Sequence, residues 1–98
     1  MENQKLTLVV KILVKSEHRA LVKNELLKLI DTTREEKGCL NYDLHQDIEN
    51  KNLFFFYENW KTRILWEAHN KNTHIAEFQK VTNGLIEELI VNEMIHIK

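Results

Sequence analysis

The chain has 98 residues, of which 30% are charged, and the acidic and basic residues nearly balance to give a net charge of −1 at pH 7. This balance leaves no basic stripe that would neutralise the phosphates of a nucleic acid, so we expect no nucleic-acid binding. The length and the even composition predict one domain over residues 1–98, and a core of this size gains much from pairing with a second copy.

The apolar runs are short, and cysteine is rare. The longest runs, such as Leu53 to Tyr57, fall far below the roughly 20 residues that span a bilayer, and the N-terminal stretch has no signal-peptide core. We therefore expect a cytoplasmic protein with no membrane partner. Cys39 has no second cysteine for a disulfide or a metal, and we interpret it as a small buried strand residue rather than as a nucleophile.

The first predicted elements are a strand over residues 5–15 and a helix after it. Alternation places five apolar residues on the strand face that we expect to meet helices: Leu6, Leu8, Val10, Ile12 and Val14. Ser16 is the predicted N-cap of a helix that runs to about Glu35. Its predicted buried stripe consists of Val22, Leu26, Leu29, Ile30 and Thr33. Gly38 supplies the turn that ends the segment.

A β-hairpin is predicted next, with strands over residues 39–47 and 53–60 joined by the polar segment 47–52. Leu40, Tyr42 and Leu44 alternate with polar residues in its first strand. In the second strand, Phe54, Phe56 and Trp60 lie on one face, and Leu53, Phe55 and Tyr57 lie on the other. One layer of helices covers only one face of a sheet. The second apolar face therefore predicts a second sheet, most simply that of an identical subunit in a homodimer.

Two short helices and a strand complete the predicted elements. Thr62 is the predicted cap of a helix from Arg63 to about Asn70, on which Leu65, Trp66 and His69 share a side. Asn72 or Thr73 caps the next helix, which carries a stripe of Ile75, Phe78 and Thr82. Gly84 permits a break, and residues 85–89 either extend that helix or lead out of it. The pattern from Ile90 to Ile97 predicts the final strand.

This order of elements predicts an α+β fold. Right-handed crossovers turn the order β-α-β-β-α-β into a ferredoxin-like fold, a four-stranded antiparallel sheet with helices on one face. A second copy would pack on the open face and complete a dimeric α+β barrel.

Histidines and aromatic side chains are the candidate chemical groups. Imidazole titrates near neutral pH, so His69 and His74 are candidate proton-transfer groups, although each could equally be a capping or hydrogen-bonded histidine. A turn between two helices could bring both to the mouth of one pocket. Tyr57 or Trp66 could orient a planar ligand by stacking, and Trp66 could instead belong to the core.

Two further polar residues are candidates for binding a substrate. His45 stands at the edge of a strand, where it contacts a ligand or faces water, and Glu58 is either an ion-paired strand carboxylate or a polar group of a pocket. The sequence has no HExxH motif, no cysteine pair and no carboxylate at a fixed spacing from a histidine, so we expect no metal site. It also lacks GxGxxG and GK[ST] loops, so no nucleotide cofactor is expected.

The residues resemble the antibiotic biosynthesis monooxygenase family of small dimeric ferredoxin-like proteins. The resemblance rests on three groups of residues across nearly the whole chain: Gly38, Cys39, Leu40, Tyr42 and Asp43; then Tyr57, Glu58 and Trp60; then His69, His74 and Phe78. Lys37 and Thr73 stand where family members commonly have proline, and both changes affect turns more than chemistry. The resemblance implies a monooxygenase that oxidises a quinol or polyphenol-type ring with dioxygen as co-substrate, without flavin, haem or metal.

The resemblance also implies roles for the candidate residues. His69 and His74 would be polar pocket groups, one of them a base, and Tyr57 and Trp66 would be walls that orient the ring. In the haem-degrading branch of the family the axial ligand is a histidine, and Gln79 stands at that place here, so no haem degradation is expected.

Two other functions stay open at the level of sequence. One branch of the family isomerises a phosphorylated autoinducer sugar derivative and carries similar motifs. Such a substrate would need a cationic partner, for which Lys61, Arg63 and Lys71 are the candidates. A non-catalytic ligand-binding dimer is the third reading, favoured if the pocket is closed or if backbone groups alone engage both histidines.

Overall fold

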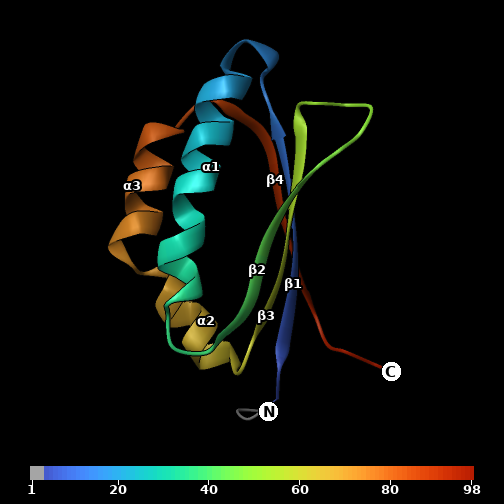
Figure 1. Cartoon of the computed structure of the whole chain (residues 1–98), viewed down its shortest axis with the longest axis vertical. Coiled ribbons are helices and arrows are strands. Elements are labelled where there is room, and N and C mark those ends of the chain that lie inside the picture. Colours follow the sequence, from blue (N-terminus) through green and yellow to red (C-terminus); the bar gives the residue numbers. More distant parts are fainter. Residues whose placement is uncertain (1–3) are drawn as a thin grey trace.

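The computed structural model describes residues 4–98, which form an antiparallel sheet with all helices on one side (Figure 1). The elements in chain order are β1 (Leu6–Val14), the short 3₁₀ helix η1 (Ser16–His18), α1 (Arg19–Arg34), β2 (Cys39–Gln46), β3 (Leu53–Trp60), α2 (Arg63–Asn70), α3 (Thr73–Val81) and β4 (Ile86–Met94). The four strands lie in the order β2-β3-β1-β4, and each neighbouring pair is antiparallel. This topology confirms the predicted ferredoxin-like α+β fold. Within residues 4–98 no helix combines the length and the apolar character that crossing a bilayer requires.

The core lies between the sheet and the helices. Alternate residues of β1 face the helices as predicted, and four of the five are buried while Val10 is half-buried. In the register of β1 against β3, Ile12 lies opposite Phe54 and Leu8 lies opposite Glu58. Phe54 and Trp60 are fully buried, and burial of each large apolar side chain stabilises the fold by roughly 1.5–3 kcal/mol. The core thus fixes which face of β3 is turned toward the helices.

The two ends of the hairpin are tied to the helices by local features that the sequence predicted. Gly38 has a φ of 89°, the left-handed conformation of a helix-ending glycine, and its carbonyl accepts a hydrogen bond from the Lys61 amide at 2.8 Å. Thr62 caps α2, since its hydroxyl oxygen accepts from the Leu65 amide at 3.3 Å. These contacts place α2 directly beneath the ends of β2 and β3.

The predicted N-cap of α1 and the predicted burial of Leu40 are both wrong. Ser16 is not the N-cap of α1, because the chain first forms the 3₁₀ turn and α1 begins at Arg19, with His18 as a cap that makes no side-chain bond. Leu40 is not buried beside Tyr42. The β2–β3 register shifts between Cys39 and Asn41, and this bulge leaves Leu40 56% exposed.

The final strand begins earlier than predicted. β4 runs from Ile86 to Met94 rather than from Ile90 to Ile97, because the chain leaves α3 through Gly84 at a φ of 81° and pairs with β1 at once. Val14 lies opposite Ile86, and the Lys15 amide donates to the Leu85 carbonyl at 3.2 Å. Residues 85–89 therefore lead out of the helix instead of extending it.

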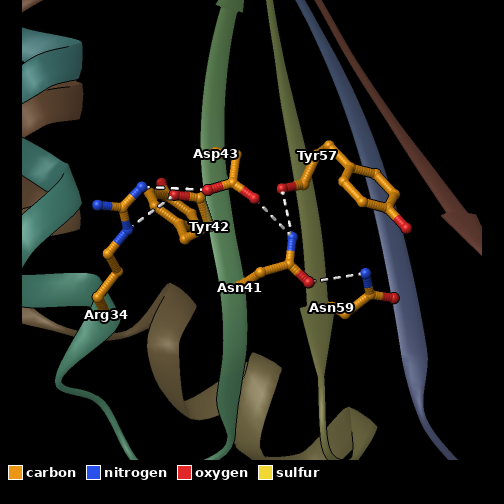
Figure 2. A network of polar contacts seen from close by, with 6 residues as sticks. All are labelled: Arg34, Asn41, Tyr42, Asp43, Tyr57 and Asn59. Atoms are coloured by element: carbon orange, nitrogen blue, oxygen red, sulfur yellow. Dashed lines mark hydrogen bonds and ion pairs between the residues drawn. The ribbon is translucent and has the colours of Figure 1, made fainter.

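The sheet face away from the helices carries polar and apolar side chains. Asn59 is buried on this face, where it accepts a hydrogen bond from the Thr7 hydroxyl at 2.6 Å and donates one to Asn41 at 2.8 Å. Asn41 also donates to Asp43 and to the Tyr57 carbonyl, as Figure 2 shows. We call this surface the open face. No described residue covers it, and the predicted second copy on it stays a prediction.

Candidate functional site

A cavity of about 170 Å³ lies between the sheet and the helices. Its walls are mostly apolar and include Phe56 of β3, Trp66 of α2 and Phe78 of α3. Leu89 and Val91 of β4 line it as well while about half of each stays exposed, so the cavity opens along that strand. A cavity on the order of 150 Å³ with apolar walls holds a benzene ring. The site therefore has the size and lining that suit one aromatic ring.

His69 is the buried imidazole of this cavity. Its side chain is 4% exposed, its ring centroid lies 4.7 Å from that of Trp60, and its Nδ1 lies 2.5 Å from Oε2 of Glu36. Burial lowers the pKa of His69 below its ordinary value of 6.5, against the opposing effect of the Glu36 carboxylate, so the ring is neutral at pH 7. A neutral ring that donates from Nδ1 keeps Nε2 unprotonated. His69 is thus arranged to accept a proton.

Glu36 holds the two histidines together. Besides His69, it accepts a hydrogen bond from Asn72 at its other oxygen, and Nε2 of His74 lies 3.4 Å from Oε2. Glu36 is not among the residues that the sequence predicted for the site, and it stands 33 residues before His69. No local pattern marks it, because only the fold brings the segment just after α1 beside the junction of α2 and α3.

The predicted meeting of the two histidines does occur in the structure. The ring centroids of His69 and His74 lie 5.8 Å apart at the junction of α2 and α3. His74 stands outside the cavity wall, where its Nε2 also makes a 2.9 Å hydrogen bond with the hydroxyl of Thr33. Only His69 therefore faces the cavity.

The same three residues are of types that bind metals. The ligand atoms of Glu36, His69 and His74 lie within 4.8 Å of one another. Two imidazoles and a carboxylate can hold zinc or iron, so the fold supplies the carboxylate that the sequence spacing did not reveal. Here Nδ1 of His69 already makes a hydrogen bond to Glu36, and Nε2 of His74 makes one to Thr33. The expectation of no metal stays a prediction.

Glu58 is the carboxyl group of the cavity. It lies on β3 between Phe56 and Trp60, is 4% exposed, and accepts a hydrogen bond from Trp60 Nε1 at 2.9 Å. Burial raises its pKa from 4.5 to about 7, the negative charge of Glu36 adds to this, and the Trp60 bond opposes it. Among the two readings of Glu58, the structure shows the pocket position.

The remaining candidates divide between the two sheet faces. Trp66 lines the cavity, and the Arg63 guanidinium lies 5.9 Å from its ring. Tyr57 is 46% exposed on the open face and His45 is exposed in β2, so the structure does not bring either to the cavity. Tyr57 precedes Glu58, and successive strand residues point to opposite faces.

Cys39 is only half-buried rather than buried as predicted. Burial is nevertheless the main cause that raises the pKa of its thiol to about 11. The thiolate that a nucleophile requires is therefore scarce at neutral pH.

Comparison with known proteins decides the family. The model of the antibiotic biosynthesis monooxygenase family matches residues 6–81. The chain belongs to this family. A Bacillus subtilis member named "Putative monooxygenase YcnE" is 33% identical over 67 residues, which cover 68% of this chain and 70% of that protein.

Solved structures of similar proteins support the fold of this family member. PA3566 from Pseudomonas aeruginosa superposes with a TM-score of 0.93 at 28% identity, covering 100% of this chain and 99% of that one. Rv0793 from Mycobacterium tuberculosis gives a TM-score of 0.90 at 19% identity, covering 97% of each chain. At that identity the second likeness concerns the fold alone.

Proposed function

We propose that this protein is a cofactor-independent monooxygenase that oxidises a small quinol or polyphenol with dioxygen. The observation that carries the proposal is the ring-sized apolar cavity with the neutral His69 in its wall. Membership of the family and the monooxygenase name of the Bacillus subtilis relative support it.

The proposed oxidation of a quinol by dioxygen requires few catalytic groups from the protein. An electron-rich phenolate donates an electron to dioxygen without help, so the protein has to bind the ring, remove a hydroxyl proton and exclude water. For a quinol the full reaction removes four electrons from the substrate. One oxygen atom enters the ring in place of a C–H hydrogen, the two ring hydroxyls become carbonyls, and the other oxygen leaves as water.

The described residues fit these tasks. Nε2 of His69 accepts the hydroxyl proton, and Glu36 positions the imidazole by holding its Nδ1–H. Phe56, Trp66 and Phe78 contact the faces and edges of the ring. His74 acts as a positioning residue, through its contacts with Glu36 and Thr33. A second copy that covers the open face completes the proposed enzyme.

Oxygen uptake with a panel of quinols tests the proposal. We expect the wild-type protein to consume dioxygen in proportion to quinol, with the same rate after addition of flavin or of a metal chelator. His69→Ala should lower kcat/KM by about 100-fold or more, because general base catalysis contributes factors of that size. His74→Ala should lower it less.

The matched control is His96→Ala, since His96 is exposed at the C-terminal end of the chain. This variant should keep the wild-type rate. The proposal is wrong if no quinol supports oxygen uptake, or if His69→Ala turns over as fast as His96→Ala.

The two other readings find less support in the site. Lys61, Arg63 and Lys71 do not line the cavity, and Arg63 is paired with Glu93 at 2.6 Å, so these cations do not face a bound phosphate. Side chains rather than backbone groups alone engage the histidines, and the cavity is open. An isomerase would convert its substrate without consuming oxygen, so substrate conversion followed under nitrogen distinguishes it from a monooxygenase.

A further inference from the structure

Glu58 occupies a position in which carboxyl groups are rarely found. It stands among apolar residues on the buried face of β3, with Leu8 of β1 opposite it on one side and Tyr42 of β2 opposite it on the other. Lys, Glu, Arg and Asp are almost never fully buried unless a partner compensates them. A carboxyl group at 4% exposure therefore calls for an explanation.

The partners of Glu58 do not supply that explanation. Its Oε1 accepts one bond from Trp60, a neutral donor, and within residues 4–98 no lysine, arginine or histidine forms an ion pair with it. The core would be better served by an apolar side chain at this place. Among the described residues no hydrogen bond is made to its second carboxyl oxygen, and Glu58 lines the cavity, so this oxygen can bind a ligand there.

We propose that Glu58 is a second acid–base residue of the cavity, which takes a hydroxyl proton from the bound aromatic ring and returns a proton to the oxygen that leaves as water. The inference rests on the proposed function, in which a quinol carries two hydroxyl protons and His69 accepts one of them. Trp60 links the two acceptors, because its ring contacts His69 and its Nε1 binds Glu58.

In the proposed reaction Glu58 acts first as a base and later as an acid. The Glu58 carboxylate takes the O–H proton, and the electron pair of that bond stays on the ring as a phenolate. Dioxygen then adds to a ring carbon, and the peroxide anion that forms takes the proton that His69 accepted from the second hydroxyl, which gives a hydroperoxide. His69, neutral again, removes the C–H proton at that carbon, the electron pair of that bond forms a C=O bond, and the O–O bond breaks. The protonated Glu58 gives its proton to the departing hydroxide, which becomes water, and the ring leaves as the anion of a hydroxyquinone while its proton passes from His69 to solvent.

A group that both takes and gives a proton works best when its pKa lies near the working pH. The titratable groups around Glu58 are Glu36 just after α1, Tyr42 and Cys39 on β2, and His69 of α2, which lines the same cavity, while β1 presents the apolar Leu8. Burial raises the pKa of Tyr42 and that of Cys39, so both stay neutral at pH 7. Burial together with the Glu36 charge sets the pKa of Glu58 at about 7.

Glu58→Gln tests the inference, since an amide keeps the size of the side chain and can still accept from Trp60. We expect kcat/KM to fall by about 100-fold, and the rise of kcat/KM with pH near 7 to disappear. Glu58→Asp should recover part of the rate together with a pH-dependent rise. Glu67→Gln is the matched control, because Glu67 is exposed on α2 and should keep both the rate and the pH profile.

A second measurement separates this inference from the proposed function. In protein labelled with ¹³C at the glutamate carboxyl groups, the Glu58 signal is assigned by its absence from Glu58→Gln and titrated with and without phenol. We expect the Glu58 signal to titrate with a midpoint near pH 7, and we expect bound phenol to shift that midpoint. The affinity for phenol, measured by tryptophan fluorescence, should depend on pH in the wild type and should lose this dependence in Glu58→Gln.

The outcomes are distinct. If the wild-type protein oxidises no quinol but phenol displaces the Glu58 titration, the proposed function fails and the acid–base contact of Glu58 is supported. If Glu58→Gln keeps the wild-type rate and pH profile, or if phenol binds without altering the Glu58 titration, the inference about Glu58 is overturned.

Discussion

The burial of Glu58 has a consequence for stability that does not depend on catalysis. Its folded-state pKa of about 7 lies above the ordinary 4.5, so the folded protein binds more protons than the unfolded chain between these pH values. The contribution of Glu58 to stability is fully present below pH 4.5 and is lost as the pH rises through 7. The loss amounts to on the order of 3 kcal/mol, since one pKa unit corresponds to about 1.4 kcal/mol.

Glu58→Gln should therefore change the pH dependence of unfolding. The wild type should lose free energy of unfolding between pH 5 and pH 8, and the variant should lack this loss. The difference between the two proteins, measured by urea denaturation at both pH values, should therefore shift in favour of the variant at pH 8. The titration of His69 occurs in both proteins and cancels in the comparison, and exposed Glu67→Gln serves as the control. An equal difference between variant and wild type at the two pH values would show that burial does not raise the pKa of Glu58.

At the same scale, the site residues that could be predicted from the sequence are those that a local pattern marks. His69 could be predicted, because its helical spacing from Leu65 and Trp66 placed it on a buried side of α2. Glu36 could not, because its role depends on a contact between residues 33 positions apart. Glu58 could be predicted in part. Alternation along the strand places it on the buried face, but no local pattern shows whether a cation pairs with it.

At the scale of elements, Gly38 controls where α2 sits. A Cβ atom added at this position would collide with Cδ1 of Leu65 and lie 2.7 Å from its Cβ, and the φ of 89° is unfavourable for residues other than glycine. Gly38→Ala should lower the free energy of unfolding by about 2–4 kcal/mol through the combined strain and clash. It should also shift α2, which carries His69, and so reduce quinol turnover.

Gly84→Ala is the matched comparison for Gly38→Ala. Gly84 has a similar φ of 81°, but a Cβ atom there would meet nothing within 4 Å. Only the backbone strain of about 1–2 kcal/mol remains, and turnover should be unchanged. Thermal and urea unfolding of the two variants measure the difference, and equal losses of stability would show that the Leu65 contact has no energetic effect.

The same elements show which local signals predict structure reliably. Thr62 was correctly identified as a cap because the helix after it begins at once. Ser16 carried the same signal and was misread, since a turn of 3₁₀ helix intervenes before α1. The exposure of Leu40 was unpredictable because it depends on a bulge that β3 imposes on β2. Local chemistry thus marks where an element can begin, and pairing with distant segments decides whether it does.

At the scale of the whole molecule, the helices cover one face of the sheet, and no described element covers the other (Figure 1). The open face presents Tyr57 of β3 and Ile90 and Met94 of β4, which are 46%, 39% and 45% exposed. Alternation in β3 predicted this second apolar face from the sequence. Whether a second molecule covers this face depends on residues of that molecule, and the pattern of a single chain contains no direct record of them.

We expect a homodimer in which the open faces of two copies pack together. Apolar surface on a sheet is stabilised when a second sheet covers it, and identical subunits are the commonest source. Sedimentation at micromolar concentration should show a species of twice the chain mass. Ile90→Glu should dissociate it, because a carboxylate buried in the interface without a partner costs several kcal/mol.

Ile48→Glu is the control for the dimer, since Ile48 is 85% exposed in the turn between β2 and β3. This variant introduces the same charge outside the open face and should sediment as the wild type does. A wild-type monomer at micromolar concentration would contradict the dimer. A dimer that persists in Ile90→Glu would place the interface elsewhere, because β4 could not bury two such carboxylates and leave the association unchanged.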